Sequence, residues 1–246
     1  MTNSWPIADR FPTLHANEIH IWWMSLECDE PELGAHRDLL SADENRRADK
    51  FLFDRHRRRF AVGRSQLRQG LAKYLKRDPA KIDFEYSGLG KPRLAGTQAG
   101  HGLCFNFSNS HERALLAVAR NVELGVDIER IRPMENLEGL ANRYFAEVEK
   151  KQILGQIDPA QTTSFFQCWT RKEAFLKAIG KGLTFPLRDV TVELRPEAAV
   201  RILEINDPHE QAQNWTLDHV EVEPEYVGAI ACRRLGNQIS RFRSTE

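Results

Sequence analysis

Two short motifs carry side chains that could bind a divalent cation. Asp127 and Glu129 belong to the motif Gly-Val-Asp-Ile-Glu, and Glu173 and Lys177 belong to the motif Trp-Thr-Arg-Lys-Glu-Ala-Phe-Leu-Lys. Carboxylates from separate elements are typical ligands of Mg²⁺ at sites that must also admit a phosphorylated substrate. The sequence therefore predicts a magnesium site formed by Asp127, Glu129 and Glu173, with the ammonium of Lys177 nearby.

The first two carboxylates are expected on one face of a β-strand. Alternate positions of residues 122–129 are apolar, so Asp127 and Glu129 share the opposite face, two residues apart. A half-buried strand with a solvated acidic edge would produce the same pattern. The segment alone leaves both interpretations open.

The other two side chains are expected on a helix over residues 163–179. Its apolar residues recur at helical spacing, and Glu173 and Lys177 lie four residues apart beside that apolar stripe. An ordinary surface ion pair, worth about 0.3 kcal/mol, is the alternative. Lys172 lies within the stripe itself, so its side chain must either extend to solvent or meet an anion.

The remaining elements alternate between strands and helices in both halves of the chain. Helices are predicted over residues 46–53, 57–74 and 145–154, and a capping box is predicted at Ser41 to Glu44. The predicted strands cover residues 18–26, 82–86, 103–107, 114–119, 190–194, 215–222 and 226–232. Because each half contains helices and several strands, two α/β lobes with a cleft between them are expected.

The composition is that of a soluble globular protein. Apolar residues make up 41% and charged residues 28% of the chain. No apolar run approaches the roughly 18 residues of a membrane helix, and the first residues do not resemble a signal peptide. We therefore expect no membrane interaction and a cytoplasmic location.

The charge is balanced overall but uneven along the chain. Lys plus Arg and Asp plus Glu number 35 each, so no global field would recruit nucleic acid. Basic residues crowd the segment 46–68, however. A small polyanionic ligand or an acidic partner protein would account for this cluster.

The two motifs taken together resemble the signature of the 4′-phosphopantetheinyl transferases of the surfactin-synthetase-activating type, Gly-Val-Asp-x-Glu followed by Trp-x-x-Lys-Glu-Ala-x-x-Lys. Three further segments resemble the family's other motifs, namely Gly90-Lys91-Pro92, Phe105-Asn106-Phe107-Ser108 and Gly180-Lys181-Gly182-Leu183. The resemblance covers most of the chain and is loose before residue 40 and after about residue 190.

One position departs from the family pattern. The family usually has histidine directly after the position of Ser108, where it is expected to contact the phosphates of the coenzyme. This chain has Asn109 there, and His111 follows two residues later. Asn109 can donate a hydrogen bond but cannot carry positive charge. The resemblance thus leaves two candidates for the phosphate contact.

The resemblance implies a fold and a reaction. The fold is α+β, with two similar α/β lobes related by pseudo-two-fold symmetry and coenzyme A in the cleft between them. Residues 1–120 would contact the nucleotide and 3′-phosphate, and residues 121–246 would carry the magnesium site and the catalytic helix. A monomeric enzyme would transfer 4′-phosphopantetheine from coenzyme A to a serine of an acyl or peptidyl carrier protein, releasing adenosine 3′,5′-bisphosphate.

The resemblance also implies roles for single residues. Glu173 would accept the serine proton, directly or through a metal-bound water, and Lys177 would stabilise the leaving group with help from Lys172. Asp127, Glu173 and Lys177 would also contact the coenzyme. Its other contacts are expected from Arg47, Arg59, Gly90, Lys91, Pro92, Asn106, Ser108 and Asn109. Carriers of fatty-acid, polyketide and nonribosomal peptide synthesis all fit this scheme.

Two other function classes fit parts of the sequence. A Mg²⁺-dependent phosphodiesterase or nuclease could use the same carboxylates and lysine to position water, although the balanced charge argues against a nucleic-acid path. A non-catalytic protein could bind carrier domains through the basic surface of residues 55–64. The intact set of carboxylates and lysine favours the transferase.

Overall fold

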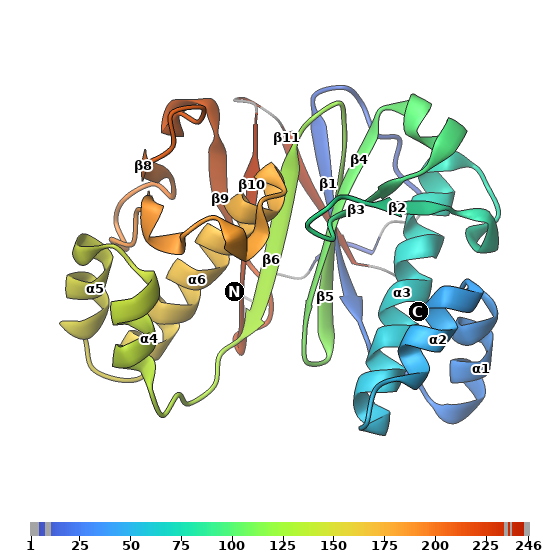
Figure 1. The fold of residues 1–246 in the computed structure, drawn as a ribbon, viewed down its shortest axis with the longest axis horizontal. Helices are drawn as coiled ribbons and strands as arrows, with labels where there is room; N and C mark the ends of the chain where they lie inside the picture. Colours follow the sequence, from blue (N-terminus) through green and yellow to red (C-terminus); the bar gives the residue numbers. More distant parts are fainter. Residues whose placement is uncertain (1–4, 8–10, 234–235, 237, 244–246) are drawn as a thin grey trace.

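Two β-sheets pack face to face in the middle of the molecule, and helices cover both outer sides (Figure 1). The computed structural model describes residues 5–7, 11–233, 236 and 238–243 of the chain. The outermost residues of the two predicted lobes, 1–4 and 244–246, lie outside this description. The architecture is α+β, as the sequence predicts.

The first sheet has the strand order β11-β1-β5-β4. Strands β1 (Glu18–Ser25), β5 (Arg113–Arg120) and β4 (Leu103–Ser110) are mutually antiparallel in that order, and β11 (Gln238–Arg243) pairs parallel to β1. The sequence did not predict β11, which returns the end of the chain to the sheet of the first half. Among the strands of the two main sheets, those up to residue 120 form the first sheet and those after it form the second. Strand β11 is the exception, because it comes from the end of the chain and belongs to the first sheet.

Helix α3 (Asp54–Leu75) covers the outer face of the first sheet (Figure 1). Helices α1 (Glu30–Asp38) and α2 (Ala42–Asp49) pack against α3. The capping box at Ser41 is confirmed, since its hydroxyl accepts from Glu44 N at 3.3 Å and the Glu44 carboxylate accepts from Ser41 N at 2.8 Å. Helix α1 was not predicted because none of its residues is buried, so it lacks an apolar stripe.

The second sheet has the order β6-β10-β9, and α6 lies across its outer face (Figure 1). Its strands are β6 (Leu124–Arg130), β10 (Tyr226–Cys232) and β9 (Thr216–Val220), all antiparallel to their neighbours. The helices of this half are α4 (Leu137–Tyr144), α5 (Glu147–Leu154) and α6 (Ala160–Ile179). Helix α4 is an addition to the predicted elements.

Two short hairpins complete the fold. Strands β2 (Phe84–Tyr86) and β3 (Pro92–Leu94) pair in the first half, and β7 (Val190–Val192) and β8 (Ile202–Ile205) pair in the second. None of the helices within the described residues is long and apolar enough to span a bilayer.

Apolar side chains on the inner faces of the two sheets form a shared core. Ile21 of β1 and Leu115 of β5 pack into the same buried cluster as Val126 of β6 and Ile230 of β10. The opposite faces of the sheets form separate cores with α3 and α6. Both sheets are therefore buried on both sides, and the position of β6 against β4 and β5 is fixed by packing.

Gly125 brings β6 and α6 unusually close together. A Cβ atom at this position would lie 2.2 Å from Ala174 O and 2.4 Å from Ala178 N, so only glycine fits. This contact places the last turns of α6 directly against β6. The glycine of the Gly-Val-Asp-Ile-Glu motif therefore sets the distance between the two elements that carry the predicted site.

Candidate active site

Asp127 lies at the centre of the site, on the face of β6 that packs against α6. The residue is 4% exposed. Its Oδ1 atom accepts hydrogen bonds from Lys177 Nζ at 2.5 Å and from Ser108 Oγ at 2.8 Å. Its Oδ2 atom is buried and has no hydrogen-bond partner among the described residues. A buried carboxylate oxygen without a partner is costly, which marks a place for a ligand.

Glu173 reaches the same group from α6, one turn before Lys177. Its Oε1 atom is also buried without a hydrogen-bond partner in the described part of the chain. Burial and then the charge of Asp127 raise the pKa of Glu173 to about 7, and Glu129 adds to this shift while Lys177 opposes it. The ionised form of Glu173 is therefore poorly compensated by the protein itself.

Glu129 is the third carboxylate, two residues further along β6. Its carboxylate accepts from Ser110 Oγ at 2.8 Å and lies 3.6 Å from a guanidinium nitrogen of Arg132. Burial and then the charge of Asp127 raise the pKa of Glu129. The charge of Asp127 raises the pKa of both Glu129 and Glu173, so the three carboxylates lie in one electrostatic environment.

The donor set suits a hard cation such as Mg²⁺. It offers carboxylate oxygens from two elements, and two of these buried oxygens have no partner among the described residues. In the arrangement described, no three Asp, Glu, His or Cys residues of the described chain are gathered closely enough to hold a metal ion. The ammonium of Lys177 instead balances the charge of Asp127.

The two faces of strand β4 contact different parts of the site: one faces the carboxylates of β6, and the other lines a pocket. Ser108 and Ser110 point toward β6 and donate to Asp127 and Glu129, respectively. Asn106, on the same face, accepts from Val126 N at 2.8 Å. Asn106 is 5% exposed and holds β4 against β6, so the structure gives it a structural contact in place of the predicted one with the pyrophosphate.

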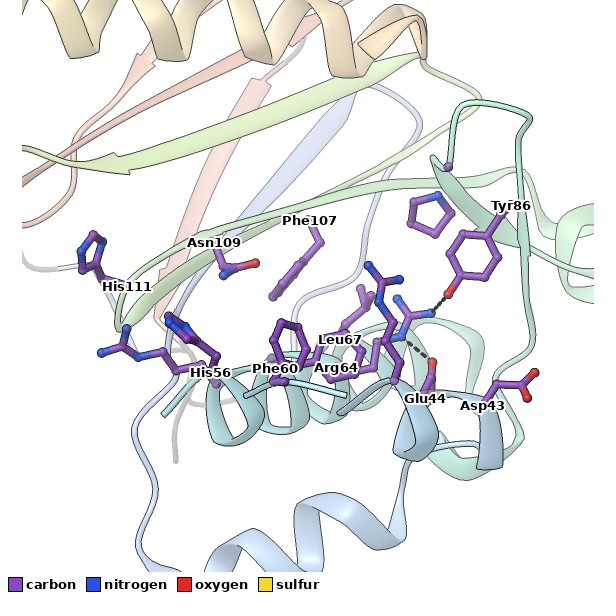
Figure 2. A pocket seen from close by; sticks show the side chains of 16 residues that line it. Asp43, Glu44, His56, Phe60, Arg64, Leu67, Tyr86, Phe107, Asn109 and His111 are labelled. Atoms are coloured by element: carbon purple, nitrogen blue, oxygen red, sulfur yellow. Dashed lines mark hydrogen bonds and ion pairs between the residues drawn. The ribbon is translucent and has the colours of Figure 1, made fainter. Parts of the chain in front are cut away.

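The other face of β4 lines a pocket of about 710 Å³ (Figure 2). The pocket also touches α2, α3 and the β2–β3 turn. Its walls combine aromatic rings with basic side chains and include Arg47, Phe51, His56, Arg59, Phe60, Arg64, Gly90, Pro92, Phe107, Asn109 and His111. This size and composition suit a small-molecule ligand that has a flat ring system and negative charge.

The three arginines of the pocket differ in how far their charge is already neutralised. Arg59 pairs with Glu112, and Arg64 pairs with Glu44. Arg47 is exposed and lies 5.4 Å above the ring of Phe60. Within the residues that the structure describes, no carboxylate forms an ion pair with Arg47. Its positive charge is therefore the most available to an anionic ligand.

Asn109 and His111 both line this pocket, as Figure 2 shows. Asn109 belongs to β4, whereas His111 lies in the turn after it with a positive φ of 54°. Burial lowers the pKa of His111, so the imidazole is mostly neutral at pH 7. The structure thus brings both candidates for the phosphate contact to one cavity.

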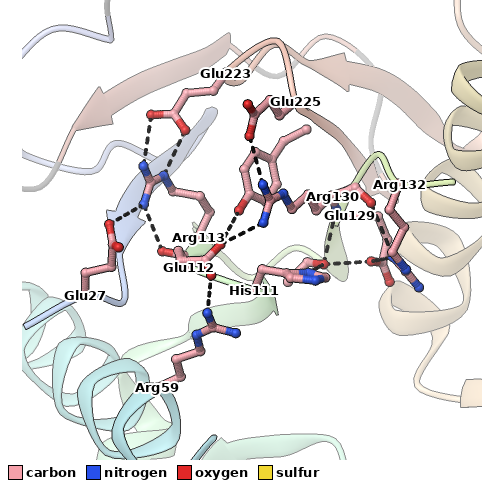
Figure 3. A network of polar contacts seen from close by, with 12 residues as sticks. Glu27, Arg59, His111, Glu112, Arg113, Glu129, Arg130, Arg132, Glu223 and Glu225 are labelled. Carbon is pink, nitrogen blue, oxygen red and sulfur yellow. Dashed lines mark hydrogen bonds and ion pairs between the residues drawn. The ribbon is translucent and has the colours of Figure 1, made fainter. Parts of the chain in front are cut away.

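Glu112, the next residue of that turn, joins the two halves of the molecule (Figure 3). Its carboxylate pairs with Arg59 of α3, accepts from Tyr226 Oη of β10 at 3.1 Å and lies 3.5 Å from a guanidinium nitrogen of Arg130 of β6. The turn that carries His111 is therefore fixed from both sides. Because Arg59 pairs with Glu112 in this network, less of its positive charge is available to a ligand in the pocket.

Lys172 is not brought to the acidic group. It is fully buried, and its ammonium lies 2.5 Å from a carboxylate oxygen of Glu149 and donates to Leu187 O at 3.0 Å. The position of this lysine within the apolar stripe predicts that it either extends to solvent or meets an anion, and the anion is Glu149. This partnership gives Lys172 a structural role and replaces the expected help to the leaving group.

Lys91 also lies elsewhere than predicted. Its neighbours Gly90 and Pro92 line the pocket, but its ammonium donates to backbone carbonyls at the end of α6 and the start of β6. The expected contact with the nucleotide is therefore replaced by a contact within the protein.

Sequence reasoning missed two residues of this region. Ser110 holds Glu129, and the alternation of polar residues at positions 106, 108 and 110 could have revealed it. Glu149 is the partner of Lys172, and nothing in its own surroundings in the sequence distinguishes it from a surface residue.

Three carboxylates and an ammonium beside a basic and aromatic pocket form the arrangement expected of an enzyme that acts on a phosphorylated substrate. Comparison with known families agrees with this class. Residues 123–231 match the model of the 4′-phosphopantetheinyl transferase superfamily, and residues 26–123 match a model described as "4′-phosphopantetheinyl transferase, N-terminal".

Individual relatives extend over nearly the whole chain. The chain is 36% identical over 226 residues to the 4′-phosphopantetheinyl transferase HetI of Nostoc sp., covering 92% of each protein. It is 29% identical over 191 residues to the 4′-phosphopantetheinyl transferase Sfp of Bacillus subtilis, covering 78% of this chain and 81% of Sfp. The chain therefore belongs to the 4′-phosphopantetheinyl transferase superfamily and is an enzyme of that class.

A solved structure shows a more distant likeness. A holo-(acyl-carrier-protein) synthase from Bacillus anthracis, in complex with CoA (3′,5′-ADP), is 20% identical with a TM-score of 0.38, over 45% of this chain and 93% of that chain. The resemblance first drawn from the motifs is confirmed by the family models and by the sequence relatives.

Proposed function

We propose that this enzyme transfers the 4′-phosphopantetheine group of coenzyme A to a serine of an apo acyl or peptidyl carrier protein. Adenosine 3′,5′-bisphosphate is the second product. The observation that carries the proposal is the arrangement around β4, where a basic and aromatic pocket and a carboxylate–lysine group lie on opposite faces of one strand. Membership in the transferase superfamily supports the same reaction.

The substrate would have to extend around the free edge of β4. This strand is the last in its sheet, so a long ligand can keep its nucleotide in the pocket while its pyrophosphate reaches Asp127 and Lys177. Arg47 would meet the 3′-phosphate, and Phe60 offers a flat surface to the base. Asn109 and His111, at the pocket wall next to the edge, would donate hydrogen bonds to the phosphates.

We also propose that the two halves are related by pseudo-two-fold symmetry. Each half is a sheet covered by one long helix, α3 or α6, and the two sheets meet through their inner faces. Coenzyme A would bind between the halves. The monomeric state and the cytoplasmic location stay predictions from the sequence.

Asp127, Glu129 and Glu173 would hold Mg²⁺, which would neutralise charge on the pyrophosphate when bound. The unpartnered oxygens of Asp127 and Glu173 support this assignment. The protein's own contribution is a set of fixed side chains, because the serine hydroxyls of β4 orient Asp127 and Glu129. This preorganisation avoids a reorganisation cost during the reaction.

The proton and the leaving group are handled by two residues of α6. Glu173 accepts the proton of the attacking serine, because its Oε1 atom has no hydrogen-bond partner among the described residues. A bond forms between the serine oxygen and the phosphorus that carries pantetheine, and the bond from that phosphorus to the bisphosphate oxygen breaks. Lys177 stabilises the negative charge that develops on this departing oxygen.

The test is a mass measurement on the carrier. The purified enzyme is incubated with coenzyme A, Mg²⁺ and each of several apo carrier proteins, and the carriers are weighed. We expect the added mass of one phosphopantetheine group, and we expect Asp127→Ala and Glu173→Ala to abolish it while circular dichroism shows an intact fold. Near-normal transfer by either variant would refute the assignment of these residues.

The same experiment separates the alternatives. A phosphodiesterase would cleave coenzyme A without labelling the carrier, and a binding module would leave both molecules unchanged. The family match does not favour either one.

A further inference from the structure

The ammonium of Lys91 has a complete set of protein partners. It donates to Leu124 O at 3.1 Å, to Lys177 O at 2.5 Å and to Ala178 O at 3.0 Å. A lysine ammonium has three N–H donors, so these three carbonyls use all of them. No donor is left for a phosphate of a bound coenzyme.

Two of these carbonyls belong to the last turn of α6. The last four carbonyls of a helix lack partners within the helix, and they form its negative end. Helix α6 ends at Ile179 and is followed by Gly180 in the left-handed conformation, with φ of 71°. A cation from another element therefore stabilises this helix end by hydrogen bonding and by charge.

The third carbonyl ties this helix end to the strand that carries Asp127. Leu124 is the first residue of β6, so one ammonium contacts the backbone of both elements of the acidic group. The contact with Lys177 O is made to the residue whose own ammonium meets Asp127. A shift of Lys91 would move the backbone of Lys177 relative to Asp127.

The backbone of Lys91 is itself fixed beside the nucleotide pocket. Ser87 accepts from Lys91 N through its hydroxyl at 3.1 Å and donates its own N–H to Lys91 O at 3.0 Å. Gly90 and Pro92, on either side of Lys91, line the pocket. A ligand that contacts this turn therefore acts on the segment that holds the end of α6.

We propose that Lys91 is a positioning residue that fixes Lys177 against Asp127 and links the nucleotide pocket to the catalytic helix. The proposal rests on the transferase function proposed above and assigns Lys91 to the protein framework. It predicts that loss of this ammonium lowers turnover and leaves binding of coenzyme A nearly unchanged.

The surroundings of Lys91 make its contacts with the three carbonyls dependent on pH. Burial and then the charge of Arg93 of β3 lower the pKa of Lys91 to about 8, while Glu123 and Cys104 oppose this shift. Toward α6 the ammonium faces backbone carbonyls. Below pH 8 the ammonium serves all three carbonyls, and above pH 8 the neutral amine has only two N–H groups.

The experiment compares Lys91→Met and Lys91→Arg with Arg93→Met, a control that removes an equal charge from an exposed position two residues away. Carrier modification at varied coenzyme A concentration gives kcat and KM. We expect Lys91→Met to lower kcat by about 100-fold, the cost of a misplacement of about 1 Å, with KM for coenzyme A changed less than threefold. Lys91→Arg should recover part of kcat and flatten the decline above pH 8, because arginine stays charged.

A second measurement does not need turnover. Amide hydrogen exchange over the end of α6, residues 176–180, should accelerate in Lys91→Met and stay unchanged in Arg93→Met. A raised KM with unchanged kcat and unchanged exchange would overturn the proposal and make Lys91 a phosphate ligand. If the unsubstituted protein labels no carrier, the transferase function fails, while the exchange comparison still decides the role of Lys91.

Discussion

The two lysines on opposite sides of helix α6 differ in how completely their carboxylate partners are hydrogen-bonded. On one side Lys172 is fully buried and meets Glu149, and both oxygens of that carboxylate also accept a backbone N–H group. On the other side Lys177 keeps 27% of its side chain exposed and meets Asp127, whose second oxygen has no partner in the described part of the chain. A complete set of partners marks a structural ion pair, and an incomplete set marks a place where a substrate is expected.

The largest expected effect comes from the incomplete side. Lys177→Met should lower kcat for carrier modification by about 100- to 1,000-fold, the usual cost of removing one preorganised charge-stabilising group. The midpoint of thermal unfolding should also fall, because the variant leaves the buried carboxylate of Asp127 without its charge partner. Steady-state kinetics and a thermal melt on the same preparation check both statements.

Lys177→Arg is the matched control. It keeps the positive charge but changes its reach and cannot donate a proton at neutral pH, so an intermediate kcat is expected. Unimpaired turnover by Lys177→Met would break the comparison between the two sides of the helix.

The next effect concerns stability. Lys172→Met leaves Glu149 charged and buried, and breaking a buried pair in this way costs about 3–5 kcal/mol of the free energy of unfolding. Urea denaturation measures this loss. The folded fraction should keep a kcat within a few-fold of the original, because Lys172 does not reach Asp127.

A double variant sharpens this result. Lys172→Met combined with Glu149→Gln removes both charges, so it should lose less stability than the sum of the single changes. A stable Lys172→Met protein with strongly reduced turnover would instead return Lys172 to the catalytic group.

The smallest effect is a pH dependence of cation binding. The pKa of Glu173 is raised from its ordinary 4.5 to about 7. The folded protein therefore binds this proton more tightly than the unfolded chain, and stability falls as pH rises from 4.5 to 7. A divalent cation reverses this penalty, so the apparent affinity for Mg²⁺ should be about tenfold lower at pH 6 than at pH 8.

Thermal shifts at increasing MgCl₂ concentration measure this affinity without substrate. Glu173→Gln, which cannot ionise, should show weak binding and a much flatter pH profile. Equal Mg²⁺ affinity at both pH values in the original protein would show that Glu173 does not share in holding the cation.

The sequence predicted the elements that carry the acidic residues and Lys177, because its motifs follow the periods of those elements. Asp127 and Glu129 share a strand face, and Glu173 and Lys177 share a helix side, so local spacing was enough to place them. Gly125 was part of the motif, but the sequence does not explain why glycine is required there. The requirement comes from the close packing of Gly125 against the backbone of Ala174.

The errors arose where partners are distant along the chain. Lys91 is 86 residues from Lys177, and nothing in the turn around Lys91 indicates that a helix end lies above it. Asn106 was likewise expected to contact the coenzyme, although its side chain accepts from Val126 N of the other sheet. Helix α1 and strand β11 were missed because α1 has no buried residues and β11 alternates only weakly.

The pairing of β11 with β1 brings the last strand of the chain back to the first strand, in the same sheet. The stretch matched by the two family models, residues 26–231, ends before β11 begins. A protein that ended with that stretch would lose the neighbour of β1 and uncover a row of backbone donors and acceptors next to Trp22 and Trp23. Such an edge invites association with other chains, so the last strand also protects the first sheet against aggregation.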